Sequence, residues 1–193
     1  MRPETTMNET GTARGFAVFE TAIGTCGIAW SPSGIVGVHL PEREASETRR
    51  RLSRRFPDAR ELPPPPDVRQ AIAGIVALLH GEPADLTSVT LDMAEVAPFN
   101  RRVYEVARTI PPGSTLTYGE IASQLGDRLL ARDVGQALGQ NPFAIVVPCH
   151  RVVAAGGKTG GFSARGGVRT KLRMLAIEGA PAAGTLPLFD DGK

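Results

Sequence analysis

Three adjacent residues, Cys149, His150 and Arg151, could together support nucleophilic chemistry. A thiolate is far more nucleophilic than a thiol, and a neighbouring imidazole or cation favours the anion. They follow an apolar run, 145–147, that predicts a buried strand, and Pro148 should end this strand because it has no amide hydrogen for the ladder. A cysteine among valine and proline can equally be a small core residue, so adjacency alone leaves both interpretations open.

The other candidate nucleophiles and ligands carry weaker signals. Cys26 has no adjacent base or cation and is expected to fill space in the core. His39 and His80 match no zinc-ligand spacing, and the two distant cysteines form neither a disulfide framework nor a Cys-x-x-Cys knuckle. The glycine pairs 156–157 and 160–161 match no phosphate-binding fingerprint. We therefore predict no metal and no cofactor.

Length, composition and charge limit the possible classes of protein. A chain of 193 residues, 41% hydrophobic and 22% charged, allows one domain or two small ones with a real core. No apolar run reaches the ~20 residues that cross a bilayer, and the first residues lack a signal-peptide core, so a cytoplasmic protein without a membrane partner is expected. Lysine and arginine number 10 against 13 acidic residues in 1–100, and 12 against 7 in 101–193. The positive second half is compatible with a polyanion partner and equally with an ordinary surface.

The first half of the chain predicts a small α/β unit in which short β-rich runs form an antiparallel meander. Helices are predicted from charge patterning and from apolar residues at helical spacing. The expected elements, in chain order, are strands 16–19, 27–30 and 35–40, helix 44–56, a stiff proline connector 63–66, helix 67–79 and strand 88–93.

The second half of the chain predicts mainly helices. Apolar spacing predicts a helix over 99–110, which Pro111 stops. Thr117 and Glu120 form a capping box that opens a helix over 118–125. A turn and a second helix over about 131–140 follow, as in a helix-turn-helix, although short helical hairpins are also ordinary packing units.

The stretch 141–152, Asn-Pro-x-x-Ile-Val-Val-Pro-Cys-His-Arg-Val, closely resembles the O6-alkylguanine-DNA alkyltransferases, the methylated-DNA–protein-cysteine methyltransferases. Tyr118 and Arg132 before it, and the Gly-Gly-Phe-Ser run 160–163 after it, extend the resemblance. The similarity is strong over about 98–179 and diffuse over 16–93. It implies an N-terminal ribonuclease H-like α/β domain and a C-terminal winged-helix-like helix-turn-helix domain that carries the reactive cysteine. The expected divisions are a disordered tail 1–14, domains 15–95 and 96–180, and a flexible tail 181–193.

The resemblance also implies how DNA is bound. In this family the recognition helix enters the minor groove, which carries little sequence information and therefore suits lesions in any sequence. By position, Arg132 matches the arginine that fills the space of the extruded nucleotide, and Tyr118 matches the tyrosine that crowds the 3′ phosphate. The implied partner is double-stranded DNA containing O6-alkylguanine, bound by a monomer, and the expected DNA-binding residues are Arg132, Tyr118, Ala131, Gly135 and Arg151.

The chemistry implied by the resemblance is irreversible alkyl transfer to Cys149 in a single turnover, from O6-alkylguanine and possibly from O4-alkylthymine. His150 matches the residue that deprotonates the thiol through a water, Glu178 matches the carboxylate that orients this imidazole, and Asn141 matches the residue that braces the cysteine loop. In the base pocket, the carbonyls of Cys149 and Val152 and the amide of Ser163 would bind guanine. Phe162, Tyr118 and Lys171 complete the expected site.

Three features depart from the family pattern. Phe162 stands where many members have tyrosine, which removes a hydroxyl from the pocket wall. The segment 164–167 is longer than in mammalian-type members, so the wall should be wider and larger alkyl groups could fit. Asp133 follows Arg132, and its charge would weaken DNA binding unless it points away or pairs with Arg128.

Three other functions are alternatives to alkyl transfer. An alkyltransferase-like damage sensor would lack the cysteine, which Cys149 argues against. A fused transcriptional activator would need additional DNA-reading and zinc domains, for which 193 residues leave no room. A Cys-His hydrolase would show turnover on an acyl substrate.

Overall fold

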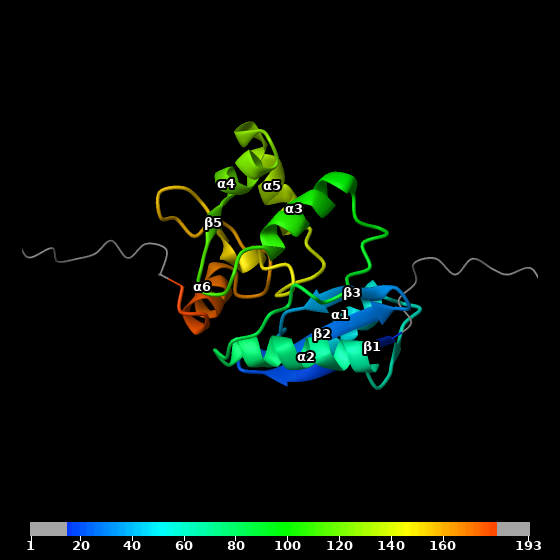
Figure 1. Cartoon of the computed structure of the whole chain (residues 1–193). Helices are drawn as coiled ribbons and strands as arrows, with labels where there is room; N and C mark the ends of the chain where they lie inside the picture. Colours follow the sequence, from blue (N-terminus) through cyan, green and yellow to red (C-terminus); the bar gives the residue numbers. More distant parts are fainter. Residues whose placement is uncertain (1–14, 181–193) are drawn as a thin grey trace, which may run out of the picture.

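The computed structural model of the chain describes residues 15–180. Within that range the first half forms a small sheet with two helices, and the second half is mainly helical (Figure 1). The expected tails 1–14 and 181–193 lie outside the described residues. No helix of the described part is long and apolar enough to cross a membrane.

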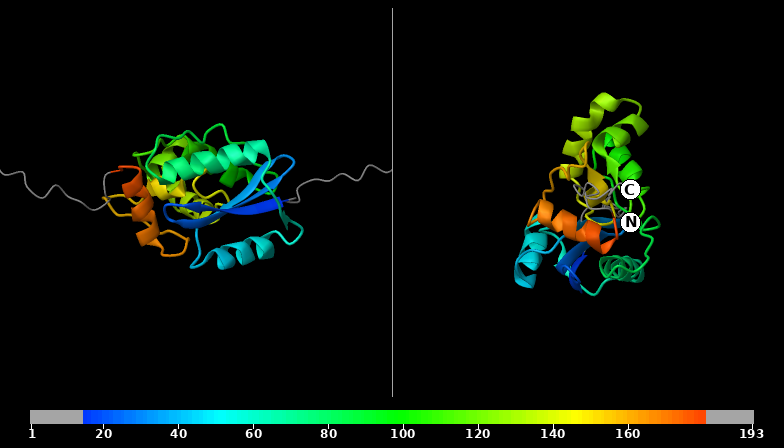
Figure 2. Two further views of the ribbon diagram at one scale, coloured as in Figure 1. Left: turned by 90° about the horizontal axis from the view of Figure 1, so that it is seen from below. Right: turned by 90° about the vertical axis from the view of Figure 1, so that its left-hand side faces the viewer.

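The N-terminal sheet has the strand order β3-β2-β1-β4. Strands β1 (Gly15–Thr21), β2 (Gly24–Ser31) and β3 (Gly34–His39) pair antiparallel, which confirms the predicted meander. The two-residue strand β4 (Arg60–Glu61), which was not predicted, pairs parallel with β1. Helices α1 (Ala45–Arg55) and α2 (Pro66–Leu79) confirm the two predicted helices and cover opposite faces of the sheet (Figure 2).

The expected strand over 88–93 is wrong. Only Leu91 forms a bridge, to Ile35 on the outer edge of β3. The next outward-facing position of that edge, Val38, instead donates its amide to the Pro142 carbonyl at 2.8 Å and bridges to Phe143. Two separate segments therefore share the edge, and neither finds enough free partners to extend into a strand.

Up to residue 180, where the described residues end, the second half contains four α-helices, two 3₁₀ turns and a two-stranded parallel sheet. The capping box is present as predicted, because the Thr117 hydroxyl accepts from the Glu120 amide while the Glu120 carboxylate accepts from the Thr117 amide. The elements are α3 (Pro98–Arg108), β5 (Leu116–Thr117), α4 (Tyr118–Gln124), η1 (Arg128–Leu130), α5 (Ala131–Gly139), η2 (Cys149–Arg151), β6 (Val152–Val153) and α6 (Val168–Ile177).

The predicted strand over 145–147 is also wrong, although these residues are buried. Ile145 has φ 74°, and the Val146 amide donates to the Ala144 carbonyl at 2.9 Å, which makes a tight three-residue turn. A β-branched residue rarely adopts this left-handed conformation, so the surrounding contacts must hold it there. The apolar run thus supplies a compact turn in the core instead of an extended strand.

Both halves share one hydrophobic core. Ile28 of β2 and Ile75 of α2 belong to the same buried cluster as Tyr104, Ile121 and Met174 from the helical half. The division into two domains at residue 95 therefore remains a prediction from the sequence. In the structure, the two parts pack against each other through this core. This shared core fixes the segment between α5 and α6, on which the reactive cysteine lies.

Candidate active site

The loop 141–149 is built to present Cys149. The Asn141 side chain donates to the Val147 carbonyl at 2.9 Å and accepts from the Phe143 amide at 2.9 Å, so one amide group bridges both arms of the loop. Pro148, at φ −81° and ψ 66°, adopts an inverse γ-turn in which the Cys149 amide donates to the Val147 carbonyl at 2.8 Å. The cysteine then opens the 3₁₀ turn η2 at a fixed position.

A buried chain of polar and charged side chains begins at the residue after Cys149. His150 Nε2 is 2.9 Å from Glu178 Oε1, and both side chains are 1% exposed. Arg151 donates from Nε to Glu178 Oε2 and from Nη2 to Oε1, both at 2.8 Å, and from Nη1 to the Ile110 carbonyl at 2.6 Å. Both carboxylate oxygens therefore have fixed donors, and the imidazole ring is held in one orientation.

The protonation states in this chain follow from its contacts. Burial alone would raise the pKa of Glu178, but the hydrogen bonds from His150 and Arg151 lower it to about 2. Burial lowers the pKa of His150 below its usual 6.5, against the raising effect of Glu178, so the ring is neutral at pH 7. Because a carboxylate can only accept, Nε2 carries the hydrogen, and Nδ1 is left as a buried basic nitrogen without a partner in the described residues.

The Cys149 sulfur is a thiol in its resting state. Burial raises the pKa of this thiol, while the Asn141 side chain, the Lys171 charge and nearby backbone amides act in the opposite direction. Adjacency to His150 and Arg151 therefore does not produce a resting thiolate as the sequence suggested. Activation needs a base, and the free Nδ1 is placed on the adjacent residue. Cys26 is fully buried and its pKa is raised to about 12 by burial, which agrees with its expected structural role.

Lys171 is a fully buried cation in the same region. Its Nζ donates to the Val152 carbonyl and lies 5.9 Å from the centre of the Tyr118 ring. Burial lowers the pKa of Lys171 to about 8, and the charge of Cys149 opposes that change. The side chain of Tyr118 is in turn close to Gly160, where an added Cβ would lie 3.0 Å from the phenol oxygen.

Cys149 opens into a cavity of about 420 Å³. Phe162 and Ser163 line it, as the resemblance implied, together with the end of α5 and the longer segment that contains Arg165. Val152 and Lys171 do not line it, which corrects their expected place in the pocket wall, because both are fully buried and are bonded to each other.

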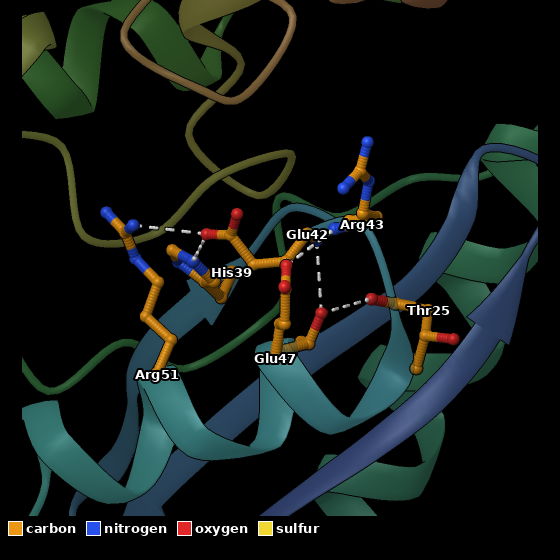
Figure 3. A network of polar contacts seen from close by, with 7 residues as sticks. Thr25, His39, Glu42, Arg43, Glu47 and Arg51 are labelled. Atoms are coloured by element: carbon orange, nitrogen blue, oxygen red, sulfur yellow. Dashed lines mark hydrogen bonds and ion pairs between the residues drawn. The ribbon is translucent and has the colours of Figure 1, made fainter.

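Part of the wall of this cavity comes from the N-terminal half, which the sequence did not predict. His39 Nε2 lies 3.2 Å from Glu42 Oε1, and Arg51 Nη1 lies 3.1 Å from the same oxygen (Figure 3). All three residues line the cavity that holds Cys149. The spacing of His39 and Arg51 along the chain carried no signal for this, because only the fold brings the end of β3 and helix α1 to the cysteine.

The expected DNA-binding residues separate into two groups. Arg132 is exposed on α5, and Ala131 and Gly135 are half-buried on the same helix, with Gly135 facing the Tyr118 ring. Arg151 is 6% exposed, so its expected contact with DNA does not hold: its guanidinium is committed to Glu178 and Ile110.

Asp133 is exposed on the same helix. It lines a hollow beside α3 together with Phe99 and Asn100. Within residues 15–180 no group of three His, Cys, Asp or Glu side chains is placed to hold a metal ion.

Comparisons with known proteins agree with this site. Residues 98–180 match the family model described as "6-O-methylguanine DNA methyltransferase, DNA binding domain". The methylated-DNA–protein-cysteine methyltransferase of Methanothermobacter thermautotrophicus is 33% identical over 82% of this chain and 81% of its own, and that of Mycolicibacterium paratuberculosis is 45% identical over 63% and 73%. The crystal structure of Mycobacterium tuberculosis OGT in complex with DNA superposes with a TM-score of 0.70 at 34% identity, covering 88% of this chain and 96% of the other. The chain belongs to the methylated-DNA–protein-cysteine methyltransferase family.

Proposed function

We propose that the protein repairs DNA by direct reversal, transferring the alkyl group of O6-alkylguanine in double-stranded DNA to Cys149. The observation that carries this proposal is the pairing of a cavity-lining thiol with a neutral, buried imidazole on the next residue. The imidazole has one nitrogen fixed by Glu178 and the other free. This arrangement can remove a thiol proton but provides no group that would regenerate the thiol afterwards.

The proton and the electron pairs balance in a single displacement. His150 Nδ1 accepts the thiol proton, directly or through one water, and Glu178 stabilises the imidazolium that forms. The sulfur attacks the alkyl carbon, the bond from that carbon to O6 breaks, and the electron pair stays on guanine. The departing guanine is an anion that takes up a proton on nitrogen and returns to its keto form. The imidazolium of His150 gives up the proton that it took from the thiol, so the net charge does not change. The product is a thioether, which water does not cleave, so each molecule acts once.

Two further residues support the sulfur as it becomes charged. The buried ammonium of Lys171 lowers the pKa of the Cys149 thiol, and Asn141 both fixes the loop and favours the anion through its side-chain hydrogen bond. In this proposal Lys171 does not line the pocket, and its bond to the Val152 carbonyl holds the ammonium in place.

The finer fold and partner assignments belong to the same proposal. Three antiparallel strands followed by a parallel fourth, with helices on both faces, support a ribonuclease H-like N-terminal half. Helices α4 and α5 with the η1 turn support a winged-helix-like helix-turn-helix that enters the minor groove as a monomer. Arg132 would occupy the space of the flipped nucleotide, and Tyr118, Ala131 and Gly135 would lie along the DNA strand.

The mass of the intact protein tests the proposed reaction. Incubation with a duplex containing O6-methylguanine should add one CH2 group at Cys149 and repair about one lesion per protein molecule. Cys149→Ser should gain nothing, while Cys26→Ala, the matched change at the other cysteine, should gain the same mass as the unmodified protein. Release of product over many turnovers would contradict the proposal and favour a hydrolase.

Glu178→Gln should impair both folding and repair. The substitution leaves the buried Arg151 charge without its carboxylate, so the free energy of unfolding should fall by ~3–5 kcal/mol. The folded pKa of Glu178, about 2, lies below its unfolded value, so the stabilisation is complete above about pH 5 and is lost as the pH falls toward 2. The difference in stability between the two proteins should therefore shrink in acid, and alkyl transfer at pH 7 should slow by ~10²-fold or more. Equal stability and equal rates in the two proteins would show that Glu178 contributes neither to folding nor to alkyl transfer.

Arg132→Ala should separate nucleotide extrusion from chemistry. Only duplex DNA requires a base to be flipped, at a cost of a few kcal/mol. The ratio of the rate on duplex O6-methylguanine to the rate on a free O6-alkylguanine base should therefore fall by ~10–100-fold. Arg69→Ala, on the exposed side of α2, is the matched control and should leave this ratio unchanged. Equal losses of Arg132→Ala on both substrates would count against extrusion as its role.

A further inference from the structure

Leu129 is the most exposed large apolar side chain in the described part of the protein. It is 87% exposed, against 44% for Leu62 and 39% for Val168. It lies on η1, which leads directly into helix α5, and α5 lies on the side of the molecule away from the N-terminal sheet (Figure 1). An isolated exposed leucine is unremarkable on most surfaces, so its position relative to its neighbours decides whether it has a role.

The backbone holds Leu129 in place. The Asp127 carboxylate accepts from the Leu129 amide at 2.8 Å, and the Asp127 carbonyl accepts from the Leu130 amide at 3.1 Å. The η1 turn then continues without a break into α5. Residues three apart in contiguous helical turns lie on the same side, so Leu129 and Arg132 face the same direction.

Two exposed cations flank this leucine. Arg128 precedes it on η1 and Arg132 follows it on α5, and both side chains are exposed. Such a pair is complementary to a polyanion. A second copy of the chain is a poor occupant, because a symmetric contact through Leu129 would bring four arginines together. Between the phosphates of DNA, the minor groove offers the apolar faces of the deoxyriboses, and proteins that bend or open DNA there commonly insert leucine or other apolar side chains.

We propose that Leu129 is an apolar contact that enters the minor groove beside Arg132 and supports the duplex while the damaged nucleotide is extruded. This inference rests on the proposed function, since it assumes that α5 is the recognition helix. It adds a large apolar side chain to the DNA-binding residues, and this contact neutralises no phosphate. Its contribution to affinity is therefore independent of salt.

Binding of an O6-methylguanine duplex to the protein in a Cys149→Ser background, measured over a range of salt concentrations, tests the proposal. Leu129→Ala should raise Kd by about tenfold, which is ~1.4 kcal/mol, without changing the slope of log Kd against log salt concentration. Leu129→Met should restore binding to near that of the parent. Leu62→Ala, the matched exposed leucine on the N-terminal half, should leave Kd unchanged. In the Cys149 protein, Leu129→Ala should lower the ratio of duplex repair to free-base transfer.

Three results would overturn the inference. An unchanged Kd for Leu129→Ala would show that the side chain stays in solvent, and a changed salt slope would show that it acts only through phosphate contacts. An effect confined to self-association of the protein would assign Leu129 to a second copy. Failure of the Cys149 protein itself to accept a methyl group would instead refute the proposed function, so the two claims fail separately.

Discussion

A carboxylate shared between an arginine and a neutral histidine in the protein interior is the constraint on which the site depends. The Glu178 side chain is 1% exposed and would be costly to bury alone, but Arg151 satisfies both of its oxygens and His150 donates to one of them. The same bonds set the tautomer of His150 and leave Nδ1 free. Because Arg151 is also anchored to the Ile110 carbonyl after α3, the chemistry is connected to the helical core and not to a mobile loop.

The short loop before the cysteine is the second constraint, and its backbone adopts uncommon conformations that fix the position of Cys149. Ile145 is held at φ 74°, Pro148 makes an inverse γ-turn, and the Asn141 side chain joins the two arms. The strain is balanced by burial of the apolar run in the core shared by both halves. Cys149 is therefore fixed in the lining of a cavity to which β3 and α1 also contribute.

Much of this could be predicted from the sequence, and the failures have physical causes. Short β-rich runs predicted the meander, and the helical spacing of apolar residues predicted the long helices. The capping pattern predicted the Thr117–Glu120 box, and all three signals depend on local sequence. The run 145–147 has the composition of a strand, but the left-handed Ile145 and the hydrogen bond from the Val146 amide to the Ala144 carbonyl fold it into a turn. Arg151 was expected on DNA because sequence shows charge and not burial, and the wall around His39 and Arg51 depends on long-range packing that no spacing encodes.

The central claim is that His150 is neutral, protonated on Nε2, and ready to accept a proton at Nδ1. Nitrogen NMR of the protein labelled at histidine, recorded between pH 7 and 8.5, measures this directly. The account predicts that, in the folded protein, His150 shows one protonated nitrogen, Nε2, and one unprotonated nitrogen, Nδ1, throughout that range, and that Glu178→Gln disturbs this pattern. An imidazolium near neutral pH, or a ring protonated on Nδ1, would contradict it.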